Sequence, residues 1–84
     1  MGEPKKLGVI THYYDKLGVG TVKLEQDLKV GDKLKFQGNK TDFEQIVEQM
    51  QFDHKDIEEA TKGQEVGIKL DEKVRDGDEV FLTE

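Results

Sequence analysis

Apolar and polar residues alternate along several short runs of this sequence. Residues 21–25 (TVKLE), 33–37 (KLKFQ) and 66–70 (VGIKL) each place an apolar side chain at every second position. Neighbouring side chains of a β-strand point to opposite faces, so this spacing puts the apolar residues on one face and the polar residues in water. The pattern predicts half-buried β-strands and an all-β fold.

Turn residues separate these runs. The 84 residues include nine glycines and one proline, which are spread along the chain and do not cluster as they would in a linker. Residues 15–18 (DKLG) stand between the β-branched and aromatic run 7–14 and residues 19–24, which predicts a hairpin. Further Gly-Asp, Gly-Asn and Asp-Gly pairs mark turns at intervals of about 8 to 12 residues, which is typical of small β-sandwiches and barrels.

We therefore expect a small closed antiparallel β-barrel of about six strands over residues 7–84, preceded by a flexible tail at residues 1–6. Closure would remove the unpaired strand edges that otherwise invite aggregation. Hydrophobic residues make up only 33% of the chain and charged residues 38%. A chain this short and this polar has room for one core, so one domain is predicted.

Residues 41–52 carry two conflicting signals. Four apolar residues follow the i, i+3, i+4, i+7 spacing of an amphipathic helix: Phe43, Ile46, Val47 and Met50. A bulged strand explains the same residues, because a bulge would move the inward phase onto Met50 and Phe52. Residues 53–62 also allow one short helical turn, which Gly63 would end.

The composition excludes several kinds of site. The chain has no cysteine, so it has no disulfide, thiolate zinc site, iron-sulfur cluster or cysteine nucleophile. It also has no serine and no phosphate-binding glycine motif. Asp53, His54 and Asp56 place an imidazole between carboxylates, but a divalent metal needs three or four convergent ligands. We therefore expect no catalytic residues, no cofactor and no metal site, and predict that the chain is not an enzyme.

The apolar runs are too short to span a membrane, and the first six residues (MGEPKK) lack the apolar stretch of a signal peptide. These features predict a cytoplasmic protein without a membrane contact. A monomer is expected.

The charges divide unevenly between the two halves of the chain. The net charge is −6, but residues 1–42 hold eight lysines against six acids, and residues 43–84 hold five bases against thirteen acids. The first half could therefore contact a polyanion such as tRNA or rRNA. The predicted RNA-binding residues are two stacking side chains and three lysines: His12, Tyr14, Lys16, Lys33 and Lys35. Of the adjacent side chains at 12–14, we expect His12 and Tyr14 to point outward.

The acidic second half gives an alternative reading as a protein-docking module. An acidic face could recognise a ribosomal or other basic protein, because charge complementarity raises the association rate. The residues predicted for that face are Glu44, Glu48, Glu58, Glu59 and Glu65.

The order of the motifs resembles domain 2 of the translational GTPases, such as elongation factor Tu and initiation factor two. The likeness lies in residues 28–32 (LKVGD), 60–70 (ATKGQEVGIKL) and 75–80 (RDGDEV), and covers residues 7–81. It implies a β-barrel of about six strands, makes residues 43–52 a strand, and implies a stand-alone, non-catalytic factor that binds RNA or the translation apparatus. The GTPase domain of that family is absent from this chain.

A narrower likeness concerns residues 41–50 (TDFEQIVEQM). They are similar to a segment in the C-terminal barrel of collagenase-like peptidases, which are often linked to RNA modification. This likeness also implies an accessory barrel.

The alternation at residues 66–70 generates a stability prediction. Replacing Val66 or Ile68 with Asp should unfold the domain, because an unpaired buried charge costs several kcal/mol or more. The test is the dispersion of the amide NMR spectrum of each variant. A well-dispersed spectrum would show that this strand does not face inward.

Overall fold

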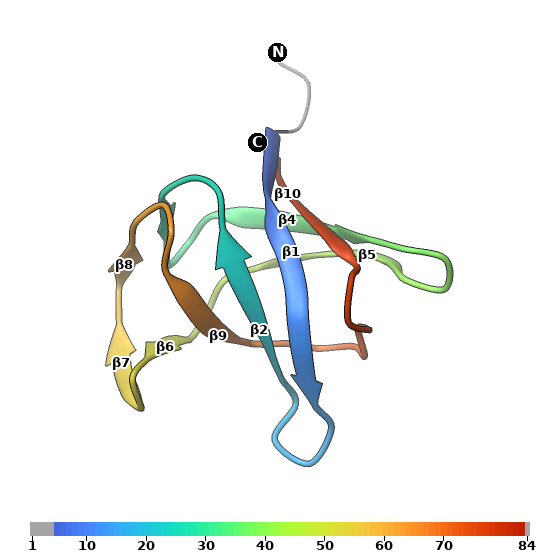
Figure 1. The fold of residues 1–84 in the computed structure, drawn as a ribbon, viewed down its shortest axis with the longest axis horizontal. Coiled ribbons are helices and arrows are strands. Elements are labelled where there is room, and N and C mark those ends of the chain that lie inside the picture. Colours follow the sequence, from blue (N-terminus) through green and yellow to red (C-terminus); the bar gives the residue numbers. More distant parts are fainter. Residues whose placement is uncertain (1–4, 84) are drawn as a thin grey trace.

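The computed structural model describes residues 5–83, which form β-strands joined by turns and contain no helix (Figure 1). The strands are β1 (Lys5–Tyr14), β2 (Val19–Leu24), β3 (Leu28–Lys29), β4 (Lys33–Gln37), β5 (Asp42–Ile46), β6 (Met50–Phe52), β7 (Lys55–Ile57), β8 (Glu59–Ala60), β9 (Glu65–Lys69) and β10 (Glu79–Thr83). The predicted all-β class is confirmed. Within residues 5–83 there is no helix long and apolar enough to cross a membrane.

Eight strands form one curled antiparallel sheet in the order β5-β4-β10-β1-β2-β9-β6-β7, and β3 pairs with β8 in a second, two-stranded sheet. β5, the first strand of this order, is followed in the sequence by β6, the last strand but one. β5 pairs with β4, and β6 pairs with β9. Counted as one bent strand, residues 42–52 complete a circuit of six strands with β4, β10, β1, β2 and β9. The sheet therefore curls around one core, as a small barrel requires.

The bent strand between β4 and β9 is held by backbone hydrogen bonds along its length. Val47 accepts from the amide of Gly31 at 2.8 Å and donates to the carbonyl of Asp32 at 2.9 Å. Gln49 accepts from the amide of Lys69 at 3.1 Å. The helical reading of this segment is wrong, and the strand implied by the resemblance is correct.

The inward phase of this bent strand shifts as a bulge predicts. Gln45 and Val47 are buried, and after the bend Met50 is buried. Ile46 is 54% exposed, so it does not belong to a buried apolar face as the helical spacing had suggested. Phe52, expected to face inward, is 38% exposed because it stands at the end of β6 next to the turn.

A hairpin replaces the helical turn considered for residues 53–62. β6 and β7 pair with Phe52 opposite Lys55, so Asp53 and His54 form a two-residue turn. Their φ angles are 54° and 63°, in the left-handed region. Tight two-residue turns need positive φ to match the twist of the strands, and side chains disfavour that region.

The core lies on the inner face of the curled sheet. Its buried apolar residues are Leu7, Ile10, Val22, Leu24, Leu28, Leu34, Phe36, Val47, Met50, Ala60, Val66, Ile68, Leu70, Val74 and Val80. Val66 and Ile68 face inward, as the alternation predicted. The rings of Phe36 and Phe43 stack with centroids 4.8 Å apart.

The tail predicted for residues 1–6 falls partly outside the described residues, which begin at Lys5. Lys5 and Lys6 belong to β1, opposite Leu82 and Phe81 of β10. Strand pairing thus begins two residues earlier than the predicted boundary of the domain.

Gln45 joins β5 to the end of β9 through its side chain. The side chain is nearly buried, and its amide nitrogen donates to the carbonyl of Lys69 at 2.9 Å. Its amide oxygen accepts from the backbone nitrogen of Asp71 at 2.9 Å. The side-chain amide thus satisfies two backbone groups at the end of β9, beyond the residues that pair with β6.

This contact generates a stability prediction. Gln45→Leu should lower the free energy of unfolding by about 1–3 kcal/mol, because two backbone groups lose their partner. Urea denaturation measures the change. The matched control is Gln37→Leu, at an exposed position of β4, which should change stability by less than about 0.5 kcal/mol. Equal stability of the two variants would show that the Gln45 bridge contributes nothing.

Candidate functional site

His12 and Tyr14 lie together on the outer face of β1, as the sequence predicted. Their ring centroids are 4.3 Å apart and the rings meet edge to face at 78°. The register with β2 shifts between Ile10 and His12, which marks a bulge. Tyr13 points the other way and packs against the core.

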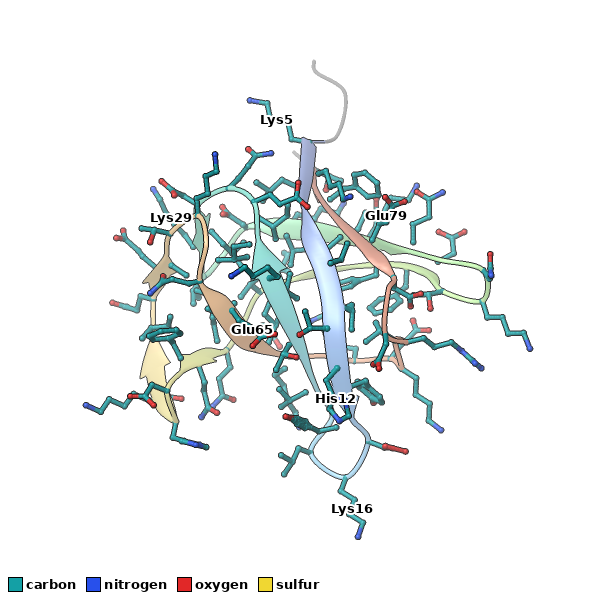
Figure 2. All side chains as sticks on the ribbon, in the orientation of Figure 1. Lys5, His12, Lys16, Lys29, Glu65 and Glu79 are labelled. Atoms are coloured by element: carbon teal, nitrogen blue, oxygen red, sulfur yellow. The ribbon has the colours of Figure 1, made fainter. Side chains whose placement is uncertain are left out.

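The three lysines predicted to bind RNA do not gather beside this aromatic pair. Lys16 lies in the turn at the free end of the β1–β2 hairpin, whereas Lys5 marks the other end of β1 (Figure 2). Lys33 pairs with Thr83, next to Leu82, which is the partner of Lys5. A ten-residue strand spans about 30 Å, so Lys16 and Lys33 lie at opposite ends of the molecule.

The five predicted glutamates do not form one acidic face. Glu44 stands opposite Lys35 and makes an ion pair with Lys33 at 3.4 Å. Glu65 stands opposite Lys23, on a different part of the sheet. Opposite charges on neighbouring strands neutralise each other, so the docking alternative based on these acids has no support.

Residues 53–56 form the β6–β7 turn and the start of β7. Asp56 accepts hydrogen bonds from the amide nitrogens of Gln51 at 2.9 Å and Gln49 at 3.4 Å. In the described part of the chain, no three His, Asp or Glu side chains are grouped so that they could hold a metal ion. Asp56 instead orients two glutamines.

These glutamines form one wall of a shallow hollow of about 210 Å³, here called the Gly67 groove. Its lining residues are Leu17, Val19, Gln49, Gln51, Gly67 and Lys69. Val19 pairs with Lys69, and Gln51 pairs with Gly67. A Cβ atom at position 67 would lie 3.1 Å from Cγ1 of Val19, so glycine keeps the floor of the groove open.

The two walls of the Gly67 groove differ in chemistry. Leu17 and Val19 supply apolar surface. The amine of Lys69 donates to the carbonyl of Leu17 at 2.8 Å and is thereby held against the hairpin. Because the glutamine nitrogens donate to Asp56, their oxygens remain as acceptors on the opposite wall. The groove can therefore seat an apolar group beside a hydrogen-bond donor.

A second hollow, of about 450 Å³, lies between the β4–β5 turn and the turn before β10. Its polar residue Asp78 is buried and accepts from the hydroxyl of Thr41 and from the backbone nitrogen of Arg75, the latter at 2.8 Å. A Cβ at Gly38 would collide with the Asp78 carboxylate, so the turn packs directly on it. Asp78 thus fastens the two turns together and already uses its acceptors within the fold.

The curled antiparallel sheet of residues 5–83 is also found in solved structures. Two crystal structures of the C-terminal domain of a Geobacillus thermoleovorans protein assigned to the U32 peptidases have the same fold. One superposes with a TM-score of 0.88, 19% identity and coverage of 95% of this chain and 93% of that chain. The other, a selenomethionine variant, superposes with a TM-score of 0.87 and 20% identity, covering 92% of this chain and 98% of that chain.

Curated relatives point in the same direction. The chain is 42% identical over 78 residues to an uncharacterized protease of Methanocaldococcus jannaschii, covering 92% of this chain and 19% of that protein. It is 35% identical over 71 residues to a collagenase of Porphyromonas gingivalis, covering 82% of this chain and 20% of the collagenase. The chain thus spans about a fifth of the length of these relatives. No family profile matches it.

The resemblance to domain 2 of the translational GTPases is therefore wrong, and with it the predicted role as an RNA-binding translation factor. The similar proteins are named as a protease and a collagenase, and the similar structures come from a U32 peptidase. Short motifs such as LKVGD and RDGDEV form tight turns between strands. Many small barrels need such turns, so these motifs indicate the fold more than the family. The narrower likeness to collagenase-like peptidases agrees with these comparisons.

The names of the relatives also conflict with the prediction that this chain is not an enzyme. Both are named as enzymes, but the matched part is about a fifth of each. The predicted partners, namely tRNA, rRNA, or a ribosomal or other basic protein, stay predictions. The monomeric state and the cytoplasmic location also stay predictions.

The sequence reasoning missed the residues of the Gly67 groove. Gln49 and Gln51 looked like ordinary polar positions, and only the fold brings them beside the β1–β2 hairpin. One signal was available: a glycine in the middle of the strand pattern VGIKL marks a place where side-chain volume is missing.

The Asp56 contacts generate a prediction about its titration. The hydrogen bond from Gln51, and then that from Gln49, lowers the pKa of Asp56 from its ordinary 3.8. A lowered folded-state pKa means that the stabilisation is present above the unfolded pKa and is lost as pH falls through the folded value. Gln51→Ala should therefore raise the pKa of Asp56 toward 3.8 in an NMR titration of its carboxyl. The control is Gln26→Ala, because the Gln26 amide donates to the carbonyl of Lys6 and not to Asp56. This variant should leave the titration midpoint of Asp56 unchanged. An unmoved midpoint in Gln51→Ala would contradict this assignment.

Proposed function

We propose that this chain is the accessory β domain of a U32-type peptidase and that it binds a polypeptide surface without cutting bonds itself. The observation that carries the proposal is the 42% identity over 78 residues to a protease of which the match covers 19%. The common fold with the C-terminal domain of a U32 peptidase supports the same position within such an enzyme.

The chemistry of the chain supports binding in place of catalysis. It has neither serine nor cysteine, the commonest peptidase nucleophiles. The inner face of the sheet is filled by apolar side chains, and the two hollows described above lie at the surface. Asp78, the buried carboxylate of the larger groove, is engaged by Thr41 and Arg75. A domain of this kind contributes by holding partners together, which raises their effective concentration.

A domain exchange tests this function. The matching 71 residues of the Porphyromonas gingivalis collagenase are replaced by this chain, and release of peptides from denatured collagen is measured. The exchanged enzyme should retain activity within about tenfold of the parent, whereas a collagenase lacking the segment should lose more than that. The 84-residue chain alone should release no peptides.

The matched control is the same exchange carrying Val66→Asp, which unfolds the inserted domain. Its activity should equal that of the enzyme lacking the segment. The proposal fails if the folded insert restores no more activity than this control, or if the isolated chain cleaves collagen.

A further inference from the structure

The free end of the β1–β2 hairpin carries exposed apolar side chains beside the Gly67 groove. Leu17 is 62% exposed and Tyr14 is 40% exposed. The register sets Tyr14 opposite Val19 and Val19 opposite Lys69, so these side chains share the outer face with the groove. We call this surface the hairpin face, consisting of His12, Tyr14, Leu17, Val19, Gln51 and Gly67.

Ion pairs among the described residues lie away from the hairpin face. Lys6 pairs with Glu25 and Glu79, and Lys33 pairs with Glu44. On the hairpin side, the amine of Lys69 is bound to the carbonyl of Leu17. An aromatic and aliphatic surface with few charges at its centre is typical of the core of a protein–protein interface.

The size of the groove favours a protein surface over a small ligand. Its volume of about 210 Å³ lies below the roughly 300–1,000 Å³ of small-molecule sites. A hollow of this size seats one or two side chains. The exposed Leu17 beside the groove can itself insert into a partner. The hairpin face thus has both a protruding apolar side chain and a hollow that can receive one.

We propose that the hairpin face packs against the remainder of a U32-type peptidase, with an apolar side chain of that part filling the Gly67 groove. The inference rests on the proposed function. About four fifths of the relatives' length lies outside the matched region, so a domain of this kind has a large neighbour in the same protein. Contacts between domains of one chain bury about 600–1,500 Å².

The groove chemistry fits such a neighbour. The free oxygens of Gln49 and Gln51 can accept from backbone amides of an adjoining segment, while the apolar wall of Leu17 and Val19 receives its side chain. None of the five glutamates predicted for docking lines the groove, and two of them stand opposite lysines: Glu44 opposite Lys35, and Glu65 opposite Lys23.

Cysteine labelling tests the proposal, because the chain has no cysteine of its own. Leu17→Cys is introduced into the 84-residue chain and into the collagenase exchange, and the rate of maleimide addition at position 17 is measured by mass spectrometry. The exposed Leu17 tolerates this change without loss of core packing. The control is Lys62→Cys, an exposed position near the opposite end of β2.

Position 17 should react at least tenfold more slowly in the exchanged collagenase than in the isolated chain, and position 62 should react equally in both. Equal reaction at position 17 overturns the proposal, even where the exchanged enzyme is active and the proposed function stands. Slow reaction of the isolated chain, together with a sedimenting dimer that Leu17→Asp dissociates, would assign the face to a second copy and also overturn it.

Discussion

The fold depends on how the curled sheet is completed between β4 and β9. Two features do this: the bent strand 42–52 pairs with β4 at one end and with β9 at the other, and the Gln45 side chain bonds the backbone of Lys69 and Asp71. A side-chain amide carries the same donor and acceptor as a peptide group, so it can substitute for one step of a ladder. The core behind it, including Val47 and Met50, is thereby kept from water.

Charge placement explains how so polar a chain adopts one register. Lysines stand opposite glutamates across several strand pairs, as at Lys23 and Glu65 and at Lys35 and Glu44. A slip by one residue would turn the apolar positions outward and also separate these charges. Several lysines thus face an acid within the sheet, and the net charge of −6 is what these pairs leave unbalanced.

Local pattern predicted most of the fold and little of the site. Period-two alternation predicted the buried positions 66 and 68. His12 and Tyr14 point outward although Ile10, which has the same parity, is buried, because the register shifts between Ile10 and His12. At Ile46 and Phe52 the pattern failed. A bend in a strand changes which side chains face inward, and the sequence does not mark where residues 42–52 bend to pair with β9. The Gly67 groove joins residues from three separate segments, and their proximity arises only from the curl of the sheet. The family likeness failed for a related reason, since barrels with similar turns share motifs without sharing ancestry or role.

The turn at Asp53 and His54 has a consequence for how the molecule comes apart. Two adjacent side-chain-bearing residues with left-handed backbones each cost about 1 kcal/mol or more. The short β6–β7 pairing and the hydrogen bonds of Gln49 and Gln51 to Asp56 offset this cost. Thermal opening should begin there and travel inward, reaching Met50 and the rest of the barrel wall last.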